Sequence, residues 1–134
     1  MISGSTTVAA PASTAGTVKT LVRVAEKVGV KINVVRQEWT VFLQSTKTHD
    51  FDLYFGAWIS SPTPDNPRQI WHTSSYNGGS NYTGFGNAET DKLIEDIEQQ
   101  LDAEKRKHLY HKFQVEVHQQ VPYVFLTVPQ TKIV

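Results

Sequence analysis

The sequence predicts an α/β fold in which a mixed sheet is flanked by helices. Three observations support this prediction: apolar residues at helical spacing in three segments, apolar runs typical of strands in three others, and the alternation of the two kinds along the chain. Strands that alternate with helices are typical of parallel or mixed sheets covered by helices. At this length the chain is predicted to be a single domain, residues 1–134.

The first elements are a loop and a helix. Residues 1–3 could be the stub of a strand, and residues 4–14, rich in Ser, Thr, Ala and Gly, are predicted to form a loop. Residues 14–28 carry apolar side chains at helical spacing, and Gly29 follows where a left-handed terminator belongs. We therefore expect a helix that ends just before Gly29.

Two strands and a short helix come next. Residues 30–34 alternate apolar and polar side chains, which predicts a half-buried strand. Thr40 can cap a short helix that ends near Lys47. Residues 51–58 form a nearly continuous apolar and aromatic run, so we expect a central strand covered on both faces.

The second half begins irregularly. Three prolines within residues 60–67 break regular structure, and Pro67 suits the start of a short helix that ends near His72. Residues 74–87 hold four glycines and are the least regular stretch of the chain. We refer to residues 76–87 as the glycine-rich loop.

Two further helices and a strand follow the loop. Asn87 and Asp102 stand where N-caps belong, each before a segment with an apolar face. Pro122 ends the second helix, and residues 123–128 are predicted to form a strand. The apolar face of the second helix consists of Leu109, Phe113 and Val117.

Composition excludes several classes of protein. The chain has 13 Lys+Arg and 13 Asp+Glu, and the formal net charge of zero argues against a nucleic-acid binder. Without cysteine there is no disulfide, thiolate metal site or cysteine nucleophile. The chain shows neither a membrane-spanning run nor a signal peptide, and both ends look cut, so we expect a segment of a longer protein.

The polar residues favour neither a metal site nor an enzyme. His108, His111 and His118 lie opposite an apolar helix face, and no further ligand is fixed by the sequence, so a solvated face is expected. No G-x-S-x-G motif occurs, and residues 84–86 lack the later glycine of a phosphate-binding loop. We expect no metal and no cofactor.

Aromatic and small polar residues gather at the irregular segments. Trp58 ends the strand expected at 51–58, and Ser60 and Ser61 follow it, at the end where open α/β sheets bind ligands. The other candidates lie in the glycine-rich loop: Gly79, Ser80, Asn81 and Tyr82. These residues suit an organic ligand held by stacking and backbone hydrogen bonds. The same composition fits Trp58 and Trp71 as core anchors beside glycines that only permit turns.

The order of these segments resembles one protein family. The segments are EKVGVKINVVRQEW, DFDLYFGAW, PTPDNP, IWHTSS, GGSNYTGFGNAETDKLIEDI, DAEKRKHLYHKFQ and VPYVFLTVP. Together they resemble the C-terminal part of the second lobe of family 5 extracellular solute-binding proteins, the peptide- and nickel-type receptors of ABC importers. The resemblance covers about residues 18–128 and implies a periplasmic-binding-protein-like lobe, present here as a fragment.

The resemblance implies a binding module and not an enzyme. The fragment would form one wall of a ligand cleft, most simply for oligopeptides, and the whole protein would dock on a membrane permease. It would be periplasmic or tethered to the outer face of the membrane. In peptide-binding members an aspartate shortly after the matching tryptophan anchors the peptide amino terminus. After Trp58 no carboxylate occurs before Asp65, which departs from that pattern.

The resemblance also implies roles for other residues. Gly79, Ser80, Asn81 and Tyr82 match the cleft loop, while the matching helix positions, Asp91, Arg106, Tyr110 and Gln114, have structural roles.

Two other functions stay open: a small hydrolase that uses Ser60 or Ser80, and a free-standing interaction domain. An excised lobe exposes apolar surface, which favours self-association. The transported solute is not specified by the sequence.

Overall fold

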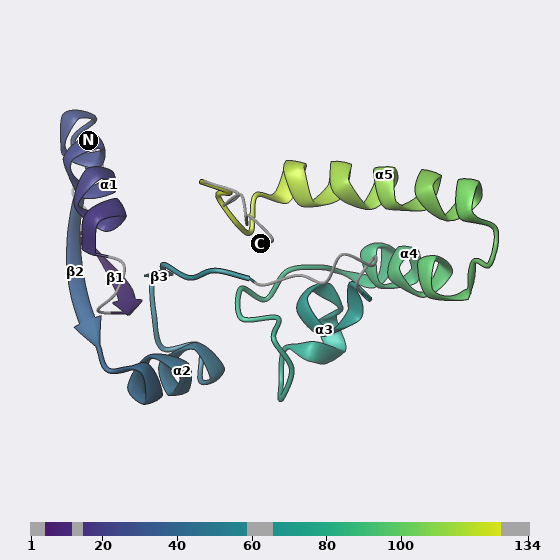
Figure 1. Cartoon of the computed structure of the whole chain (residues 1–134), viewed down its shortest axis with the longest axis horizontal. Helices are drawn as coiled ribbons and strands as arrows, with labels where there is room; N and C mark the ends of the chain where they lie inside the picture. Colours follow the sequence, from purple (N-terminus) through teal and green to yellow (C-terminus); the bar gives the residue numbers. More distant parts are fainter. Residues whose placement is uncertain (1–4, 12–14, 59–65, 127–134) are drawn as a thin grey trace, which may run out of the picture. The chain divides into compact units, whose positions relative to one another are not determined.

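A computed structural model describes residues 5–11, 15–58 and 66–126 (Figure 1). The chain divides into two compact units, Met1–Asp65 and Asn66–Val134, and each is described by itself. The expectation of a single domain stays a prediction. Among the described residues, no helix is both long enough and apolar enough to cross a membrane.

The first unit contains a parallel three-stranded sheet in the order β2-β1-β3 (Figure 1). The strands are β1 (Ser5–Pro11), β2 (Lys31–Gln37) and β3 (Leu53–Tyr54). Both neighbours run parallel to β1, and Val8 pairs with both of them. The described strands therefore form a parallel sheet, and the prediction of a mixed sheet is wrong for them.

The central strand is β1, in a segment predicted to be a loop. Val8, Ala9 and Ala10 are between 2% and 4% exposed, so the middle of the strand is core. The prediction of a loop at residues 4–14 is wrong for the part that forms β1. The segment has small side chains next to polar residues, so its sequence does not indicate a buried parallel strand. The strand is buried by elements that lie far along the chain. Residues 1–3 lie outside the described residues.

The run at residues 51–58 is not the central strand. Only Leu53–Tyr54 forms β3, at the end of the strand order, and Leu53 is 47% exposed. The carboxylate of Asp52 accepts the Thr7 N–H at 2.9 Å, so a side chain replaces a ladder hydrogen bond just before β3. Just after β3, the Phe55 N–H still donates to the Ala9 carbonyl at 2.9 Å.

The predicted strand at residues 30–34 is confirmed as β2, which extends to Gln37. It is less buried than predicted, because only Ile32 and Gln37 are partly buried and Val34 is 38% exposed. The alternation of apolar residues thus predicted the position of the strand but not the extent of its burial.

Two helices complete the first unit. α1 (Ala15–Lys27) confirms the first predicted helix, and Gly29 follows with a φ of +81°. α2 (Trp39–Lys47) confirms the second, but Glu38 rather than Thr40 occupies its N-cap position and makes no side-chain cap. α1 packs mainly against β2, and α2 packs against β1.

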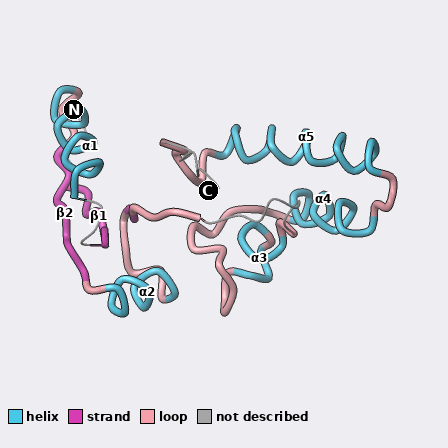
Figure 2. The backbone as a smooth tube through the Cα atoms, viewed as in Figure 1, coloured by secondary structure: helices cyan, strands magenta, loops and turns pink. Residues whose placement is uncertain are grey.

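The described residues of the second unit form helices and loops (Figures 1 and 2). α3 (Arg68–Trp71) and a 3₁₀-helix (Thr73–Ser75) precede the glycine-rich loop, and α4 (Ala88–Gln99) and α5 (Ala103–Gln120) follow it. α5 turns back along α4, and the two helices pack together. The predicted short helix ending near His72 is confirmed as α3.

An aromatic and aliphatic core joins these helices. Trp71 makes edge-to-face contacts with Phe85 and Phe113, with ring centroids 5.3 and 5.9 Å apart. Trp71 is therefore a core anchor of the second unit. Leu109 and Val117 pack beside Phe113 as the helical spacing predicted. The fully enclosed members of this core are Phe85, Ile94, Ile97 and Phe113.

The predicted starts of the last two helices are confirmed, whereas Leu101, expected on the apolar face of the first of them, lies beyond its end and is 91% exposed. The side chains of Asn87 and Asp102 accept backbone N–H groups at the starts of α4 and α5. α5 ends before Val121, whose φ is +48°. Residues 123–126 form no strand, which contradicts that part of the prediction at 123–128, while residues 127 and 128 lie outside the described residues.

Candidate functional site

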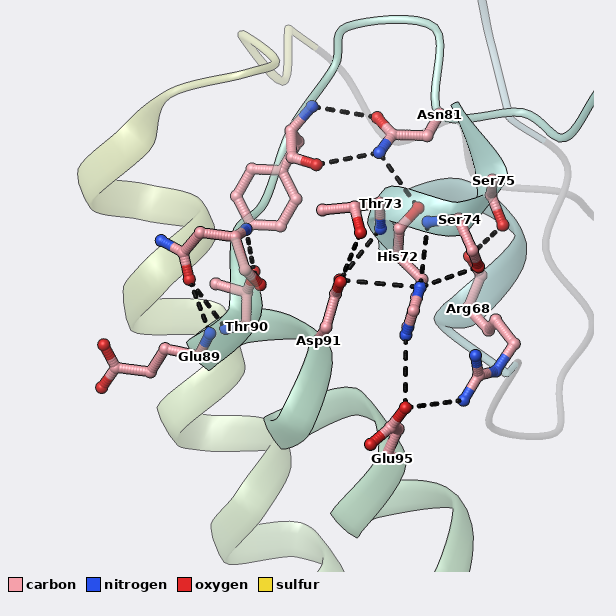
Figure 3. A network of polar contacts seen from close by, with 12 residues as sticks. Arg68, His72, Thr73, Ser74, Ser75, Asn81, Glu89, Thr90, Asp91 and Glu95 are labelled. Carbon is pink, nitrogen blue, oxygen red and sulfur yellow. Dashed lines mark hydrogen bonds and ion pairs between the residues drawn. The ribbon is translucent and has the colours of Figure 1, made fainter. Parts of the chain in front are cut away.

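The glycine-rich loop is organised around the side chain of Asn81 (Figure 3). Asn81 is fully buried, and its Nδ2 donates to the carbonyls of Phe85 at 2.8 Å and His72 at 3.2 Å. The Phe85 N–H donates to Asn81 Oδ1 at 3.0 Å. One amide thus satisfies three backbone groups and holds the loop against the segment before it.

The residues just before Asn81 lie against α3 and the 3₁₀-helix. The Ser80 N–H donates to the Gln69 carbonyl at 3.0 Å, and the Ser80 side chain is almost completely buried. A Cβ added at Gly79 would lie 2.6 Å from both Cβ and the carbonyl oxygen of Ser75. Glycine is therefore required at position 79 by close packing of the backbone.

Exposed aromatic surface in the loop comes from Tyr76, which is 40% exposed. Its ring lies beside Gly84, where an added Cβ would be 3.3 Å from the ring and where φ is +66°. Tyr82 is half-buried. Tyr76 is not among the site residues that the sequence predicts, since no pattern distinguishes an exposed tyrosine from a buried one.

Asp91 at the start of α4 fixes the 3₁₀-helix that precedes the loop. Its carboxylate accepts the Thr73 N–H at 2.9 Å and also the Thr73 hydroxyl. The His72 ring, 7% exposed, lies beside it and caps the same turn by accepting the Ser74 N–H on Nδ1. The structural role expected for Asp91 is confirmed, and His72 caps the 3₁₀-helix.

A charged pair joins α3 to α4. Arg68 donates from Nε and Nη2 to the carboxylate of Glu98 at 2.9 and 2.7 Å, and its Nη2 lies 3.8 Å from Glu95. The hydrogen bonds from Arg68 lower the pKa of Glu98, although partial burial opposes the shift. The pKa of Arg68 is raised mainly by the same bonds.

The predicted site residues divide between the two units. Gly79, Ser80, Asn81 and Tyr82 lie together in the glycine-rich loop of the second unit. Trp58, 44% exposed, belongs to the first unit. Ser60 and Ser61 lie outside the described residues. Solute contact at these positions stays a prediction.

The described residues contain no cluster of His, Asp or Glu side chains suited to a metal ion. The side chains of His108, His111 and His118 are exposed along α5, as expected for a solvated face. Arg106 donates from Nη1 to the Gln100 carbonyl at 3.4 Å, at the end of α4, which is a structural role.

No family model matches the sequence. Among curated proteins, the oligopeptide-binding protein AppA of Bacillus subtilis is 29% identical over 106 residues, which are 78% of this chain and 19% of AppA. The heme-binding protein A of Haemophilus influenzae is 33% identical over 99 residues, 73% of this chain and 18% of that protein. The chain thus spans about a fifth of the length of the curated relatives it matches.

Solved structures give the same result for the fold. The Bacillus subtilis AppA structure in complex with a nonapeptide superimposes with a TM-score of 0.79 and 24% identity, over 89% of this chain and 24% of AppA. The Helicobacter pylori DppA structure with the peptide STSA gives 0.80 and 22%, over 90% and 24%. The structure of NikZ of Campylobacter jejuni with Ni(L-His) also matches, and among the curated sequences a probable deoxycholate-binding periplasmic protein of Escherichia coli is 27% identical over 96 residues. The chain belongs to family 5 of the extracellular solute-binding proteins, as a segment about a fifth as long as its curated relatives.

Proposed function

We propose that this chain is part of the substrate-binding component of an ABC importer and that its solute is a peptide. The observation that carries the proposal is the match to AppA and to several di- and tripeptide-binding proteins. This family is non-enzymatic, which removes the serine-hydrolase alternative. The relatives also include proteins whose names or structures specify heme, Ni(L-His) or deoxycholate, so membership of the family does not by itself specify a peptide.

The glycine-rich loop forms one wall of the ligand cleft in this proposal. The side-chain amide of Asn81 does not bind the solute in this proposal, because its donor and acceptor atoms already bind the backbone of His72 and Phe85. Its part is to fix the loop, while the ring of Tyr76 offers a stacking surface. Trp58, described within the first unit by itself, is proposed as a further aromatic contact for the solute.

Recognition of a charged peptide amino terminus requires a carboxylate from another source. Residues 59–64 contain no Asp or Glu, so the segment after Trp58 supplies hydrogen bonds and no compensating charge. Binding by stacking and backbone hydrogen bonds is tolerant of sequence. In the whole receptor, a solute that contacts both lobes shifts the population toward the closed form that docks on the permease, outside the cell membrane.

A chimera tests the proposal. The segment of Bacillus subtilis AppA that matches this chain is replaced by the residues of this chain, and binding of a nonapeptide is measured by calorimetry and thermal shift. We expect binding within about tenfold of the parent, since the wall is preserved. A folded chimera whose thermal midpoint moves with no peptide contradicts the proposal.

Two tryptophan variants of the chimera separate the site from the fold. Trp58→Ala is expected to weaken binding about tenfold or more, because a stacking surface is lost. Trp39→Ala is the matched control: Trp39 is 59% exposed on α2 and is not among the proposed solute contacts, so its loss should leave the affinity unchanged. Equal affinities for the two variants contradict the role of Trp58.

A further inference from the structure

His72 is the one buried histidine among the residues that the structure describes. It lies between α3 and the 3₁₀-helix, and its ring faces α4 (Figure 3). Its Nε2 is buried, makes no hydrogen bond with any residue that the structure describes, and lies 3.6 Å from Oε1 of Glu95. A buried polar atom without a partner has a cost, and a second arrangement of the ring could remove it.

The hydrogen bonds of the ring specify its tautomer. Nδ1 accepts the Ser74 N–H at 3.1 Å, so in the neutral ring the proton is on Nε2. The Ser74 hydroxyl lies 2.8 Å from the same Nδ1 and can either donate or accept. The Ser74 amide can only donate. The cap on Ser74 therefore exists only while Nδ1 carries no proton.

Charged groups surround the ring on two helices. From α4, Oδ1 of Asp91 lies 3.6 Å from Nδ1, and Glu95 faces Nε2. From α3, Arg68 binds Glu98 and approaches Glu95. A doubly protonated ring would direct one N–H toward each of the carboxylates of Asp91 and Glu95. Asp91 is the group that holds Thr73, so the protonated ring competes for it.

This turn is the base of the glycine-rich loop. Asn81 Nδ2 donates to the His72 carbonyl at 3.2 Å, and the Asn81 N–H donates to the Ser75 carbonyl at 3.2 Å. A change in the backbone between His72 and Ser75 therefore moves the groups on which Asn81 rests.

We propose that His72 positions the glycine-rich loop through its cap on Ser74, and that a second proton on the ring releases this cap and loosens the base of the loop. Acidification that protonates the ring then changes the loop without any solute present. The consequence for transport, weaker solute binding at low pH, rests on the proposed function. The change in the loop does not.

NMR titration of the chain without solute tests this. We expect the His72 ring to be the Nε2–H tautomer at pH 8. On acidification the Ser74 amide proton should lose its downfield shift, with the same midpoint as the His72 ring protons. His72→Asn is the informative variant, because Asn Oδ1 can accept the Ser74 N–H and does not titrate. His108→Asn, on the exposed face of α5, is the control, and its Ser74 amide shift should depend on pH as in the wild type.

Three results overturn the proposal. The first is a His72 ring that keeps one protonation state from pH 8 to pH 5. The second is a Ser74 amide that does not move while the ring titrates. The third is the same Ser74 titration in His72→Asn as in the wild type. The first two need no variant, so a variant that fails to fold leaves the test intact, and no outcome depends on whether the chain binds a peptide.

Discussion

Asn81 and Phe85 are joined by two hydrogen bonds that close a ring between a side-chain amide and a backbone. The Phe85 N–H donates to Asn81 Oδ1 at 3.0 Å, and Asn81 Nδ2 donates to the Phe85 carbonyl at 2.8 Å. The ring of Phe85 is in the core beside Trp71 and Phe113. The loop is thereby attached to the helical core through one polar side chain and one aromatic ring.

Loss of the Asn81 side chain should destabilise the second unit. Asn81→Ala leaves the N–H and carbonyl of Phe85 buried without partners, and we expect a loss of about 2–3 kcal/mol in the free energy of unfolding. Urea denaturation measures it. Asn77→Ala, at an exposed position of the same loop, is the control and should change stability by less than about 0.5 kcal/mol. Equal midpoints for the two variants would contradict the role of Asn81.

Gly79 and Gly78 should respond differently to alanine. At Gly79 a methyl group would lie 2.6 Å from Ser75, so the backbone must shift, and the bond from the Asn81 N–H to the Ser75 carbonyl should weaken. At Gly78 an added Cβ meets nothing within 4 Å, and only the φ of +89° opposes it. Amide hydrogen exchange at Asn81 measures the difference. Faster exchange is expected for Gly79→Ala alone, and equal rates contradict the packing argument.

Helix ends were predictable because their chemistry is local. Asn87 and Asp102 bind N–H groups two or three residues away, and Gly29 adopts its positive φ where the helix stops. The family could be recognised for a similar reason: ordered segments keep their spacing along the chain. These features need no knowledge of what lies across the fold.

The sequence patterns misplaced two of the three strands, because the burial of a strand depends on partners far along the chain. β1 is central although its segment reads as a loop, and the aromatic run at 51–58 contributes two residues to the sheet. The sequence also did not predict that the Asn81 side chain binds the backbone of its own loop. An asparagine among glycines fits a ligand contact as well as a hydrogen bond within the loop. The charged surroundings of the His72 ring could not be predicted, because Asp91 and Glu95 approach it from a helix later in the sequence.

The cap of α4 should contribute a measurable part of the stability. Asn87 Oδ1 accepts the N–H groups of Glu89 and Thr90 at 2.9 and 3.1 Å, and Thr90 Oγ1 accepts the Asn87 N–H in return. Asn87→Ala is expected to cost about 1 kcal/mol of unfolding free energy in urea. Asn87→Asp keeps the acceptor and should lie within about 0.5 kcal/mol of the wild type. An aspartate variant as unstable as the alanine one would show that the cap is not the cause.

The Arg68–Glu98 pair should add stability that depends on pH. Because Arg68 lowers the pKa of Glu98 below its ordinary value of 4.5, the contribution is fully present above about that pH. It is lost as the pH falls through the lower pKa of the folded state. Both side chains are partly exposed, so we expect about 0.2–1 kcal/mol at pH 7.

Urea denaturation of Glu98→Gln at several pH values measures this contribution. The wild type should be the more stable protein at pH 7, and the difference should shrink progressively as the pH falls below about 4.5 and Glu98 is protonated. Glu116→Gln, at a partly buried position of α5 where the structure gives no ion pair with any described residue, should show no such trend. Because screening weakens an exposed pair, added salt should reduce the difference at pH 7. A difference between the wild type and Glu98→Gln that is constant from pH 7 to pH 3 would mean that the glutamate acts through packing rather than charge.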